Sequence, residues 1–473
     1  MRRTKIVATI GPASRSADVL RALIEAGTDV VRLNFAHGNA VEHARMIRRA
    51  RRLARSLGRP LAILQDLQGP KIRIGRLRGG RAEIRRGSRL ILTSRRVLGH
   101  ARLLPTNYRR LPQEVRSGDR VLLDDGRIEL RVISASGTEI RCRAVEGGTV
   151  LEHKGINLPG VRLSAPALTD KDRADALLGT RLGVDYVALS FVRRAQDLHS
   201  LRRLLEGEGL DTPIIAKIEK PEAVQNLDEI LQASDGVMVA RGDLGVEMSP
   251  EEVPIVQKHV VARGRAAGKP VITATQMLDS MRVNPRPTRA ESSDVANATF
   301  DGADALMLSG ETADGRYPVE SVAMMQRIIQ RVESAAILAA AEEPFEEGVE
   351  VAETLADAAC RVAKASRARG IVALTVTGST ARLISSFRPP VPVIALSPEE
   401  STVRRLALFW GVRPLLSRRR HSIEHLLEDM ERRLIRENLA SLGDSVVIIS
   451  GLPFTPGAPT NLLKVHRITH APG

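Results

Sequence analysis

Short apolar segments recur along the first two thirds of the chain, and helical patterns separate most of them. Each segment has the length and the content of aliphatic residues that are typical of a buried parallel strand. Residues 16–27 show the helical spacing, with Ser16 placed to cap the helix and Gly27 placed to end it. Strands are predicted at residues 5–10, 29–35, 61–67, 185–191, 213–219, 235–241, 270–275 and 304–309. Strands joined by helical crossovers in this number predict a (β/α)8 TIM barrel of the α/β class.

The connection between the third and fourth predicted strands is too long to be a loop. It shows strand-like alternation of its own. Turn signals lie within it at Asp125-Gly126, Ser136-Gly137 and Gly147-Gly148. We therefore predict an inserted β-rich lid domain over residues 70–166, attached to the end of the barrel at which active sites form. The catalytic barrel then comprises residues 1–69 and 167–340.

After residue 340 the alternation of helices and strands starts again on a smaller scale. The acidic segment 341–348 is a predicted linker. Helices are predicted at residues 351–369, from Ser379, at 401–410 and at 423–440, with strands at 371–376, 392–397, between the last two helices, and at 445–450. This order predicts a C-terminal open α/β domain over residues 341–473.

Composition limits the cellular setting. The 473 residues are 43% hydrophobic, which suits a globular protein of two or three domains. The sequence shows neither an apolar run of the roughly 18 residues that a membrane span needs nor the apolar region of a signal peptide. Cys142 and Cys360 lie far apart without metal or redox spacing. We expect a cytoplasmic protein with no membrane partner.

The net charge of +16 raises the alternative of a basic RNA-binding protein. The arginines, however, are spread along the chain, mostly on predicted helix faces. Aromatic residues make up only 2% of the chain, so stacking platforms for single strands are scarce. We expect no nucleic-acid partner, and instead a positive field that favours anionic substrates.

Polar residues gather at the carboxyl ends of the predicted barrel strands. They are Arg32, Asn34, His37, Asp66, Lys217, Glu219, Arg241, Asp243, Thr275, Ser309 and Glu311. Glu219 and Asp243 offer the hard oxygen ligands that suit Mg²⁺ or Mn²⁺, whereas a His/Cys cluster for zinc is missing from the sequence. Arg32 and Lys217 offer positive charge to phosphate and carboxylate oxygens. Such a set is suited to stabilise a phosphoryl group or an enolate, without a Walker loop or a kinase glycine loop.

Motifs distributed over nearly the whole chain form a recognisable set. They are TKIVATIGPAS (4–14), RLNFAHG (32–38), GINLPG (155–160), AKIEKPEAVQNLDEI (216–230), ARGDLGVEM (240–248), TATQMLDSM (273–281), NPRPTRAESSDVANATFDGADALMLSGETADGRYPVE (284–320) and NLLKVHRI (461–468). Together they resemble the pyruvate kinase family, which has the same three parts. The resemblance implies transfer of a phosphoryl group from phosphoenolpyruvate to ADP, giving pyruvate and ATP. It also implies a need for Mg²⁺ or Mn²⁺ and a homotetramer.

The resemblance implies a role for each of these residues. Arg32 binds the transferring phosphate, and Lys217 stabilises the charge on the phosphate and on the enolate oxygen. Glu219 and Asp243 hold the metal. The implied contacts are the backbone of Arg241, Gly242 and Asp243 together with Thr275 for the substrate carboxylate, Asn34, His37, Arg73 and Lys154 for the nucleotide, and Ser309 and Glu311 for proton delivery.

The segment that contains Asp66 and Lys71 departs from the family. Members that need K⁺ bind it with a set that resembles Asn34, Asp66, a serine hydroxyl and a threonine carbonyl. The positions that depart together here are Ala36, Leu67, Lys71 and Ile74. An ammonium group carries the same unit charge as K⁺, so we predict that Lys71, with Asn34 and Asp66 nearby, replaces K⁺ and that K⁺ is not required. The alternative is a surface lysine that follows a turn.

A glycine-containing turn precedes the predicted helix at Ser379. Its backbone and hydroxyl groups could bind a phosphate, as the effector site of the family does, or it is a plain turn. The predicted effector residues are Thr375, Thr377, Gly378, Ser379 and Thr380. The later loop, residues 450–461, lacks an arginine for a second phosphate. This favours a phosphorylated effector with one phosphate, such as AMP or a hexose or pentose monophosphate.

A second enzyme class shares much of this equipment. Metal-dependent aldolases that act on pyruvate also place an acid pair and an arginine on a (β/α)8 barrel. They need neither an inserted lid nor a third domain, and they leave the motifs at residues 32–38 and 155–160 unexplained.

Overall fold

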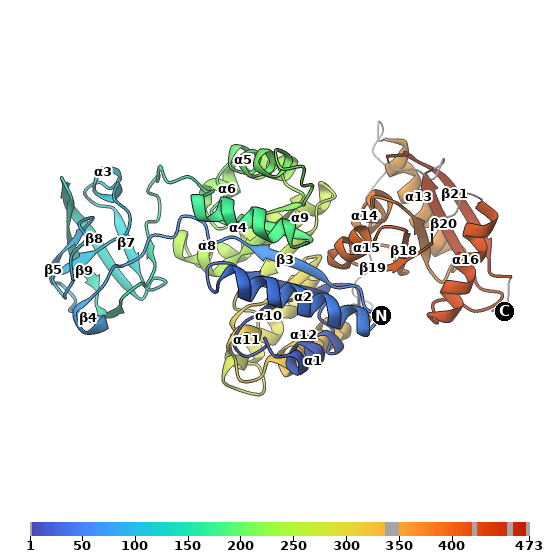
Figure 1. Cartoon of the computed structure of the whole chain (residues 1–473), viewed down its shortest axis with the longest axis horizontal. Helices are drawn as coiled ribbons and strands as arrows, with labels where there is room; N and C mark the ends of the chain where they lie inside the picture. Colours follow the sequence, from blue (N-terminus) through green and yellow to red (C-terminus); the bar gives the residue numbers. More distant parts are fainter. Residues whose placement is uncertain (1, 336–349, 419–422, 452–456, 470–473) are drawn as a thin grey trace.

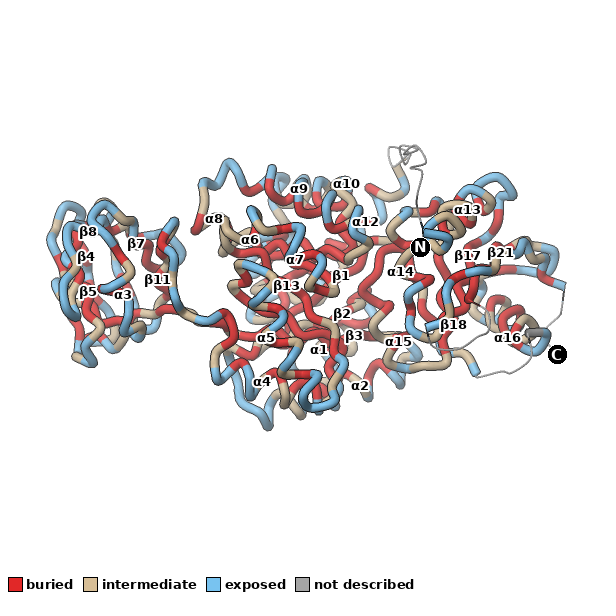
Figure 2. Tube along the Cα trace, turned by 90° about the horizontal axis from the view of Figure 1, so that it is seen from above, coloured by how far each residue is buried: buried red, intermediate tan, exposed pale blue. Residues whose placement is uncertain are grey.

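The chain folds into three parts that lie in a row. The computed structural model describes residues 2–335, 350–418, 423–451 and 457–469. The inserted lid lies at one end, the barrel in the middle and the C-terminal domain at the other end (Figure 1, Figure 2). The predicted linker, residues 341–348, lies outside the described residues, as does part of the loop 450–461.

Eight parallel strands form the closed central barrel, and they pair in chain order. The strands are β1 (Lys5–Ile10), β2 (Val30–Asn34), β3 (Ala62–Asp66), β12 (Tyr186–Leu189), β13 (Ile214–Ile218), β14 (Gly236–Ala240), β15 (Val271–Ala274) and β16 (Ala305–Leu308). Each lies within the segment predicted for it from the hydrophobic pattern. The prediction of a (β/α)8 barrel is therefore confirmed.

Helices cover the outside of the barrel, and short helices follow several strands at its carboxyl end. They are α1 (Ala17–Glu25), α2 (Ala40–Ser56), α4 (Asp170–Arg181), α5 (Ala195–Glu206), α6 (Pro221–Gln225), α7 (Leu227–Ala233), α8 (Arg241–Glu247), α9 (Val253–Ala266), α10 (Arg289–Phe300), α11 (Gly310–Ala313) and α12 (Pro318–Ser334), with the 3-10 turn η2 (Asp279–Arg282). The signals read for α1 are confirmed, since the Ser16 side chain accepts a hydrogen bond from Val19 N–H and Gly27 adopts φ +121°. None of the helices in the described part of the chain combines the length and apolar composition that a membrane span requires.

The barrel interior changes from apolar to polar along its axis. Side chains alternate across a strand, so residues two apart face the same side. One buried apolar cluster contains Leu64 of β3 and Ile215 of β13 together with core residues of the C-terminal domain. Two positions further along the same strands stand Asp66 and Lys217. The alternation thus places Asp66 and Lys217 together at the carboxyl end of the interior.

Two sheets form the inserted lid around a core of its own. A six-stranded sheet has the order β11-β7-β8-β9-β5-β6, and β10 pairs with β4. Their bounds are β4 (Arg81–Ile84), β5 (Arg89–Thr93), β6 (Leu103–Pro105), β7 (Arg120–Leu123), β8 (Ile128–Ser136), β9 (Glu139–Glu146), β10 (Gly148–Leu151) and β11 (Ile156–Asn157), with the short helices η1 (Arg78–Gly80) and α3 (Leu111–Glu114). The predicted turns at residues 125–126 and 136–137 join β7 to β8 and β8 to β9. The insertion is therefore β-rich, as predicted.

The C-terminal domain is an open five-stranded sheet with the order β19-β18-β17-β20-β21. Its elements are α13 (Val351–Ala365), β17 (Ile371–Leu374), α14 (Ser379–Ser386), β18 (Val393–Ser397), α15 (Glu400–Arg405), η3 (Leu406–Leu408), β19 (Val412–Leu416), α16 (Ile423–Arg436), β20 (Ser445–Gly451) and β21 (Thr460–Arg467). The sequence did not predict β21, because this antiparallel edge strand is largely solvent-accessible and carries no long apolar run. The predicted helix 401–410 divides into α15 and a 3-10 turn, and the predicted helix 423–440 ends at Arg436.

The two cysteines lie in different domains. Cys142 is on β9 of the lid and Cys360 is on α13, and both are free and buried. Burial raises the pKa of each thiol to about 12. Neither thiol is therefore activated for redox chemistry or metal binding.

The C-terminal domain packs against the end at which the barrel strands begin. Lys5, at the start of β1, donates to the carbonyl of Val412 (2.6 Å), and the hydroxyl of Tyr186, at the start of β12, donates to the carbonyl of Arg405 (2.7 Å). Both contacts lie at the apolar end of the barrel interior. The polar end is left to the lid.

The ion pair of Arg388 and Asp304 is the contact that we expect to stabilise the junction between the barrel and the C-terminal domain most. Arg388 donates from both terminal nitrogens to the carboxylate, at 3.0 Å each, and Asp304 is 3% exposed. We expect Arg388→Met to lower the free energy of unfolding by about 3 kcal/mol, because it leaves a buried carboxylate without its counter-charge. Urea unfolding measured by the fluorescence of Trp410, the only tryptophan, reports on this contact, since the guanidinium lies 5.0 Å from the centre of its ring.

The matched control is Arg361→Met, which removes an exposed pair with Asp357 on α13. Exposed pairs contribute little, so this control should shift the urea midpoint only slightly. A shift for Arg388→Met no larger than that of the control would contradict the role given to the junction pair.

Candidate active site

A continuous chain of polar contacts crosses the carboxyl ends of five neighbouring barrel strands. It starts at Thr9 on β1, whose hydroxyl accepts a hydrogen bond from Nη1 of Arg32 on β2 (3.1 Å). Arg32 in turn binds Oδ2 of Asp66 on β3 through Nε and Nη2, at 2.7 Å each. Asp66 is 1% exposed and has therefore lost most of its hydration. The positive charge of the Arg32 guanidinium compensates for that loss.

Lys217 on β13 is the second cation of this chain. Its Nζ lies 3.2 Å from Oδ1 of Asp66 and 2.7 Å from Oε1 of Glu219. It also donates to the hydroxyl of Ser190, at 2.7 Å, and Ser190 donates to the carbonyl of Leu67, also at 2.7 Å. An ammonium group has three N–H donors, and these contacts account for all of them. The side chain is thereby held in one orientation.

Burial and mutual attraction act in opposite directions on these charges. Burial alone raises the pKa of Asp66, but Lys217 and Arg32 outweigh it and hold the pKa below its ordinary value. Burial alone lowers the pKa of Lys217, but Asp66, Glu219 and Asp243 outweigh it and raise the pKa. Asp66 and Lys217 are therefore both charged at neutral pH. Burial raises the pKa of Glu219, and the charge of Asp243 adds to this effect against the opposing effect of Lys217.

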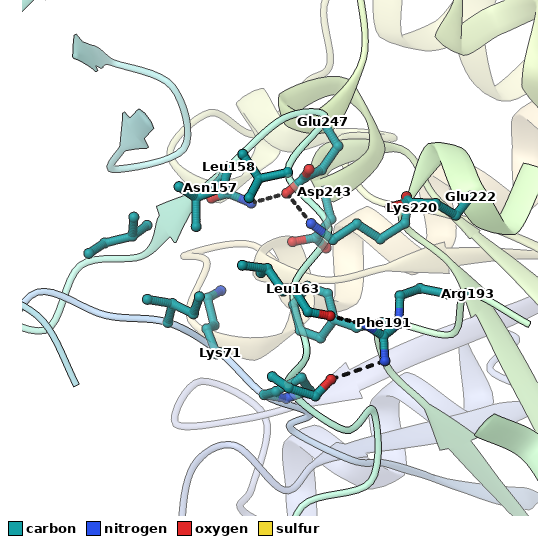
Figure 3. Close-up of a pocket in the computed structure, with 15 residues that line it drawn as sticks. Lys71, Asn157, Leu158, Leu163, Phe191, Arg193, Lys220, Glu222, Asp243 and Glu247 are labelled. Atoms are coloured by element: carbon teal, nitrogen blue, oxygen red, sulfur yellow. Dashed lines mark hydrogen bonds and ion pairs between the residues drawn. The ribbon is translucent and has the colours of Figure 1, made fainter. Parts of the chain in front are cut away.

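Glu219 and Asp243 have the chemistry of a divalent-metal site. Glu219 is 1% exposed and accepts a hydrogen bond from the N–H of Phe191 (2.8 Å). Asp243 lies in the first turn of α8 and lines the cavity drawn in Figure 3. Because Asp243 disfavours ionisation of Glu219, a cation bound to both would remove that cost. In the described ranges no group of three or more His, Cys, Asp or Glu residues converges on one point.

The start of α8 lies against Thr275. The N–H of Gly242 donates to the Thr275 hydroxyl (2.7 Å), and Nη2 of Arg241 donates to the Thr275 carbonyl (2.7 Å). Arg241 also pairs with Asp294 at 2.7 Å, so its side chain has a structural task. Thr275 itself adopts φ +71°, which costs a β-branched residue about 1–3 kcal/mol. Such strain is typical of functional sites.

Ser309 and Glu311 follow β16 and contact one another through the backbone. The Glu311 carboxylate accepts hydrogen bonds from the N–H groups of Ser309 (2.8 Å) and Leu278 (3.0 Å). Burial raises the pKa of Glu311, although these N–H groups oppose the shift. The hydroxyl of Ser309 is buried and has no hydrogen-bond partner among the described residues. A buried hydroxyl without a partner is available to a substrate or to a water.

The residues expected at the nucleotide divide between the barrel and the lid. Asn34 and His37 stand at the end of β2 and just beyond it, where Asn34 Oδ1 accepts from Ala36 N–H (3.1 Å) and His37 is exposed. Arg73 and Lys154 lie on adjoining lid segments, which Ile74 N–H joins to the Lys154 carbonyl (2.9 Å). The structure brings the backbones of these two segments together at the base of the lid, where Nζ of Lys154 pairs with Asp124 (2.8 Å).

Lys71 lines the same cavity as Asp243 (Figure 3). In the described part of the chain, its ammonium group forms no ion pair or hydrogen bond with Asn34 or Asp66. The reason is that Asp66 is already bound by Arg32 and Lys217. Lys71 therefore lines the cavity, whereas the sequence predicted it near Asn34 and Asp66.

The predicted effector residues form a compact turn at the start of α14. Gly378 adopts φ +88°, and its N–H donates to the Thr375 hydroxyl (2.9 Å). Thr377 and Ser379 are exposed, and their hydroxyls lie 3.1 Å apart. The Thr380 hydroxyl is buried against that of Thr460. The structure leaves two exposed hydroxyls at a helix N-terminus, which is the geometry that a phosphate uses.

Sequence reasoning missed two members of the polar chain, Thr9 and Ser190. Both stand at the carboxyl ends of barrel strands, so the rule that found their neighbours would have found them. Their side chains are small hydroxyls within apolar segments, and hydroxyls at such places usually satisfy the local backbone.

Comparisons with known proteins give the family. The model described as "Pyruvate kinase, barrel domain" matches residues 1–322, and the model described as "Pyruvate kinase, alpha/beta domain" matches residues 353–466. The chain is 46% identical to a pyruvate kinase of Sporosarcina psychrophila, covering 99% of this chain and 81% of that one. It is 41% identical to a pyruvate kinase of Clostridium acetobutylicum, covering 99% of this chain and 100% of that one.

A solved structure agrees with these sequence matches. A pyruvate kinase from Cryptosporidium parvum superimposes with a TM-score of 0.92 at 36% identity, covering 99% of this chain and 96% of that one. The matches include the lid and the C-terminal domain, which the aldolase alternative left unexplained. The chain therefore belongs to the pyruvate kinase family of phosphotransferases.

Proposed function

We propose that Lys217 is the main charge-stabilising group in the transfer of the phosphoryl group of phosphoenolpyruvate to ADP. The observation that carries this proposal is the position of Lys217 between two buried carboxylates, Asp66 and Glu219, at the polar end of the barrel. Its charge is fixed in place before any substrate arrives. A preorganised cation of this kind stabilises negative charge that develops during reaction without having to reorganise.

The neighbouring groups divide the remaining work. Arg32 offers its free N–H groups to the phosphoryl oxygens as the bond from phosphorus to the enolate oxygen breaks and the bond to a β-phosphate oxygen of ADP forms. Lys217 then stabilises the charge on the enolate oxygen.

The Thr275 hydroxyl and the backbone at the start of α8 bind the substrate carboxylate. The unpartnered hydroxyl of Ser309, with Glu311 beside it, delivers a proton to the enolate carbon. The nucleotide contacts are Asn34, His37, Arg73 and Lys154.

Glu219 and Asp243 would hold the divalent metal, Mg²⁺ or Mn²⁺. When bound, the metal supplies positive charge to the phosphoryl and enolate oxygens. Glu219 and Asp243 place two negative charges close together, and a bound cation would relieve their repulsion.

We also propose that the enzyme does not require K⁺. Three oxygen atoms that resemble the K⁺ ligands of other members already have partners: Asn34 Oδ1 accepts from the Ala36 N–H, Asp66 pairs with Arg32 and Lys217, and the Leu67 carbonyl accepts from Ser190. Lys71 adds a positive charge to the cavity that Asp243 lines. The substrate phosphate and the metal ligands gather negative charge there, so the ammonium supplies what K⁺ supplies elsewhere.

Regulation is proposed at the turn before α14. The exposed hydroxyls of Thr377 and Ser379 and the helix N-terminus would bind the phosphate of an effector, such as AMP or a sugar monophosphate. The family resemblance supports a homotetramer as the assembly in which such an effector acts.

The first test concerns Lys217. A coupled assay that follows pyruvate formation from phosphoenolpyruvate and ADP should show activity in the unmodified enzyme. We expect Lys217→Met to lower kcat by at least about a thousandfold, because the cation acts mainly on the transition state. The matched control is Lys258→Met on α9, whose exposed lysine pairs with Asp301. A loss of less than about tenfold would remove Lys217 from its assigned role.

The second test concerns K⁺. With Mg²⁺ present and a bulky organic cation as the only monovalent ion, we expect the enzyme to keep its activity. Lys71→Glu should lower activity at least about tenfold by reversing the charge in the cavity, whereas Lys71→Arg should keep most of it. Adding Ala36→Ser, Leu67→Thr and Ile74→Thr to Lys71→Glu should make activity respond to K⁺. An unmodified enzyme that is inactive until K⁺ is added would contradict the proposal.

The third test concerns the effector. A phosphorylated metabolite should lower the apparent KM for phosphoenolpyruvate in the unmodified enzyme. Ser379→Glu should abolish that shift, because a carboxylate repels the phosphate. Ser366→Glu, an exposed change at the end of α13, should leave it in place. If AMP and sugar monophosphates leave the saturation curve unchanged, the turn has only a structural role.

A further inference from the structure

One contact between lid and barrel has no part in the roles given above. The side-chain amide of Asn157, on lid strand β11, donates to Oε1 of Glu247 at the end of α8 (3.0 Å). The same oxygen lies 2.7 Å from Nζ of Lys220, which follows β13. Figure 3 shows these three side chains meeting at one side of the cavity. We call Asn157, Glu247 and Lys220 the lid latch.

The latch is built around a buried charge. The side chain of Glu247 is 2% exposed and that of Lys220 is 12% exposed. A buried carboxylate is costly unless a counter-charge and hydrogen bonds replace its water. Lys220 supplies the counter-charge from the barrel, and Asn157 supplies a hydrogen bond from the lid. Withdrawal of the lid removes that hydrogen bond, so the carboxylate favours the closed position.

The latch also joins the two segments that carry the proposed metal ligands. Lys220 directly follows Glu219 in the chain. Glu247 stands four residues after Asp243 in α8, which places both carboxylates on the same face of the helix, one turn apart. The ion pair of Lys220 and Glu247 therefore links the end of β13 to α8. The hydrogen bond from Asn157 to Glu247 links the lid to the same pair.

A second contact of the lid with the barrel differs in kind. Arg193 donates to the backbone carbonyls of Leu163 (2.6 Å) and Ala165 (3.0 Å), where the chain returns from the lid to the barrel. Figure 3 shows the bond to Leu163 on the other side of the cavity. Because Arg193 binds the connection itself, it anchors the hinge. The Asn157 contact is the one that has to break when the lid swings away.

We propose that Asn157 and Glu247 are positioning residues that couple closure of the lid to the placement of Asp243. Neither touches the reacting atoms. The latch sets the fraction of enzyme in which the lid is closed and α8 is in place when the substrates are bound. The part of this proposal that concerns Asp243 rests on the metal site proposed above.

The main test is Asn157→Ala, which removes the lid side of the latch and leaves Glu247 paired with Lys220. A hydrogen bond to a charged group contributes about 1.5 kcal/mol, so we expect KM for the substrates to rise about tenfold, with a smaller change in kcat. Hydrogen exchange of the amides of β11 and α8 in the substrate-free enzyme should become faster. The thermal midpoint should change little, because the lid keeps its own core.

The matched control is Glu129→Gln, which removes an ion pair with Arg120 inside the lid sheet. It should leave KM and the exchange of α8 unchanged. Glu247→Ala should raise KM, and Asn157→Ala added to it should raise KM less than about twofold further, since both changes remove the same hydrogen bond. The proposal is overturned if Asn157→Ala leaves KM and exchange as they were, or if the two effects on KM multiply independently.

The half-saturating Mg²⁺ concentration separates this proposal from the metal assignment. Asp243→Asn should raise it strongly, and Asn157→Ala should raise it slightly through α8. If Asp243→Asn has no effect while Asn157→Ala still changes KM and exchange, the latch holds the lid but the metal site is wrongly placed. If Asp243→Asn acts as expected and Asn157→Ala changes nothing, the latch is overturned and the metal site stands.

Discussion

The charge balance around Lys217 is the constraint on which the catalytic end of the barrel depends. One ammonium group is shared by Asp66 and Glu219, and Arg32 completes the compensation of Asp66. Removing Lys217 leaves the buried Glu219 without its counter-charge, and removing Asp66 does the same to Arg32. The contacts join β1, β2, β3, β12 and β13, so they exist only when these strands pair in this order. The charges at this end of the barrel are therefore also part of the fold.

The polarity of the barrel interior along its axis explains the order of the three domains. At the end where strands begin, the interior is apolar and continuous with the core of the C-terminal domain, so that domain covers it permanently. At the other end the interior carries charges that have to meet anionic substrates. A permanent cover there would prevent exchange of substrate, and a lid with its own core can move as a unit. The turn before α14 consequently lies near the end at which the barrel strands begin, away from the polar end.

Some of the arginines have a structural task within the protein. Arg51 donates to the carbonyls of Leu61 and Gly183 and pairs with Asp185, and Arg193 and Arg388 bind backbone carbonyls at the hinge and at the domain junction. A guanidinium presents several donors in a fixed plane, which suits backbone carbonyls at the ends of strands and helices. These arginines are spent within the protein, so a net charge of +16 does not by itself mark a nucleic-acid surface.

The sequence by itself determined the barrel strands, the presence of a β-rich insertion and most of the polar residues at the strand ends. It could do so because alternation along a strand and the length of apolar runs are local properties. It did not reveal β21, whose place depends on pairing with β20. It also did not reveal the contacts of Thr9 and Ser190, because their hydroxyls bind Arg32 and Lys217, which come from other strands. The tertiary structure alone decided that Asp66 pairs with Lys217 and Arg32 and that Lys71 lines the cavity instead. The physical reason is that a buried carboxylate pairs with the cation nearest in space, and distance in space follows from the closure of the barrel rather than from spacing along the chain.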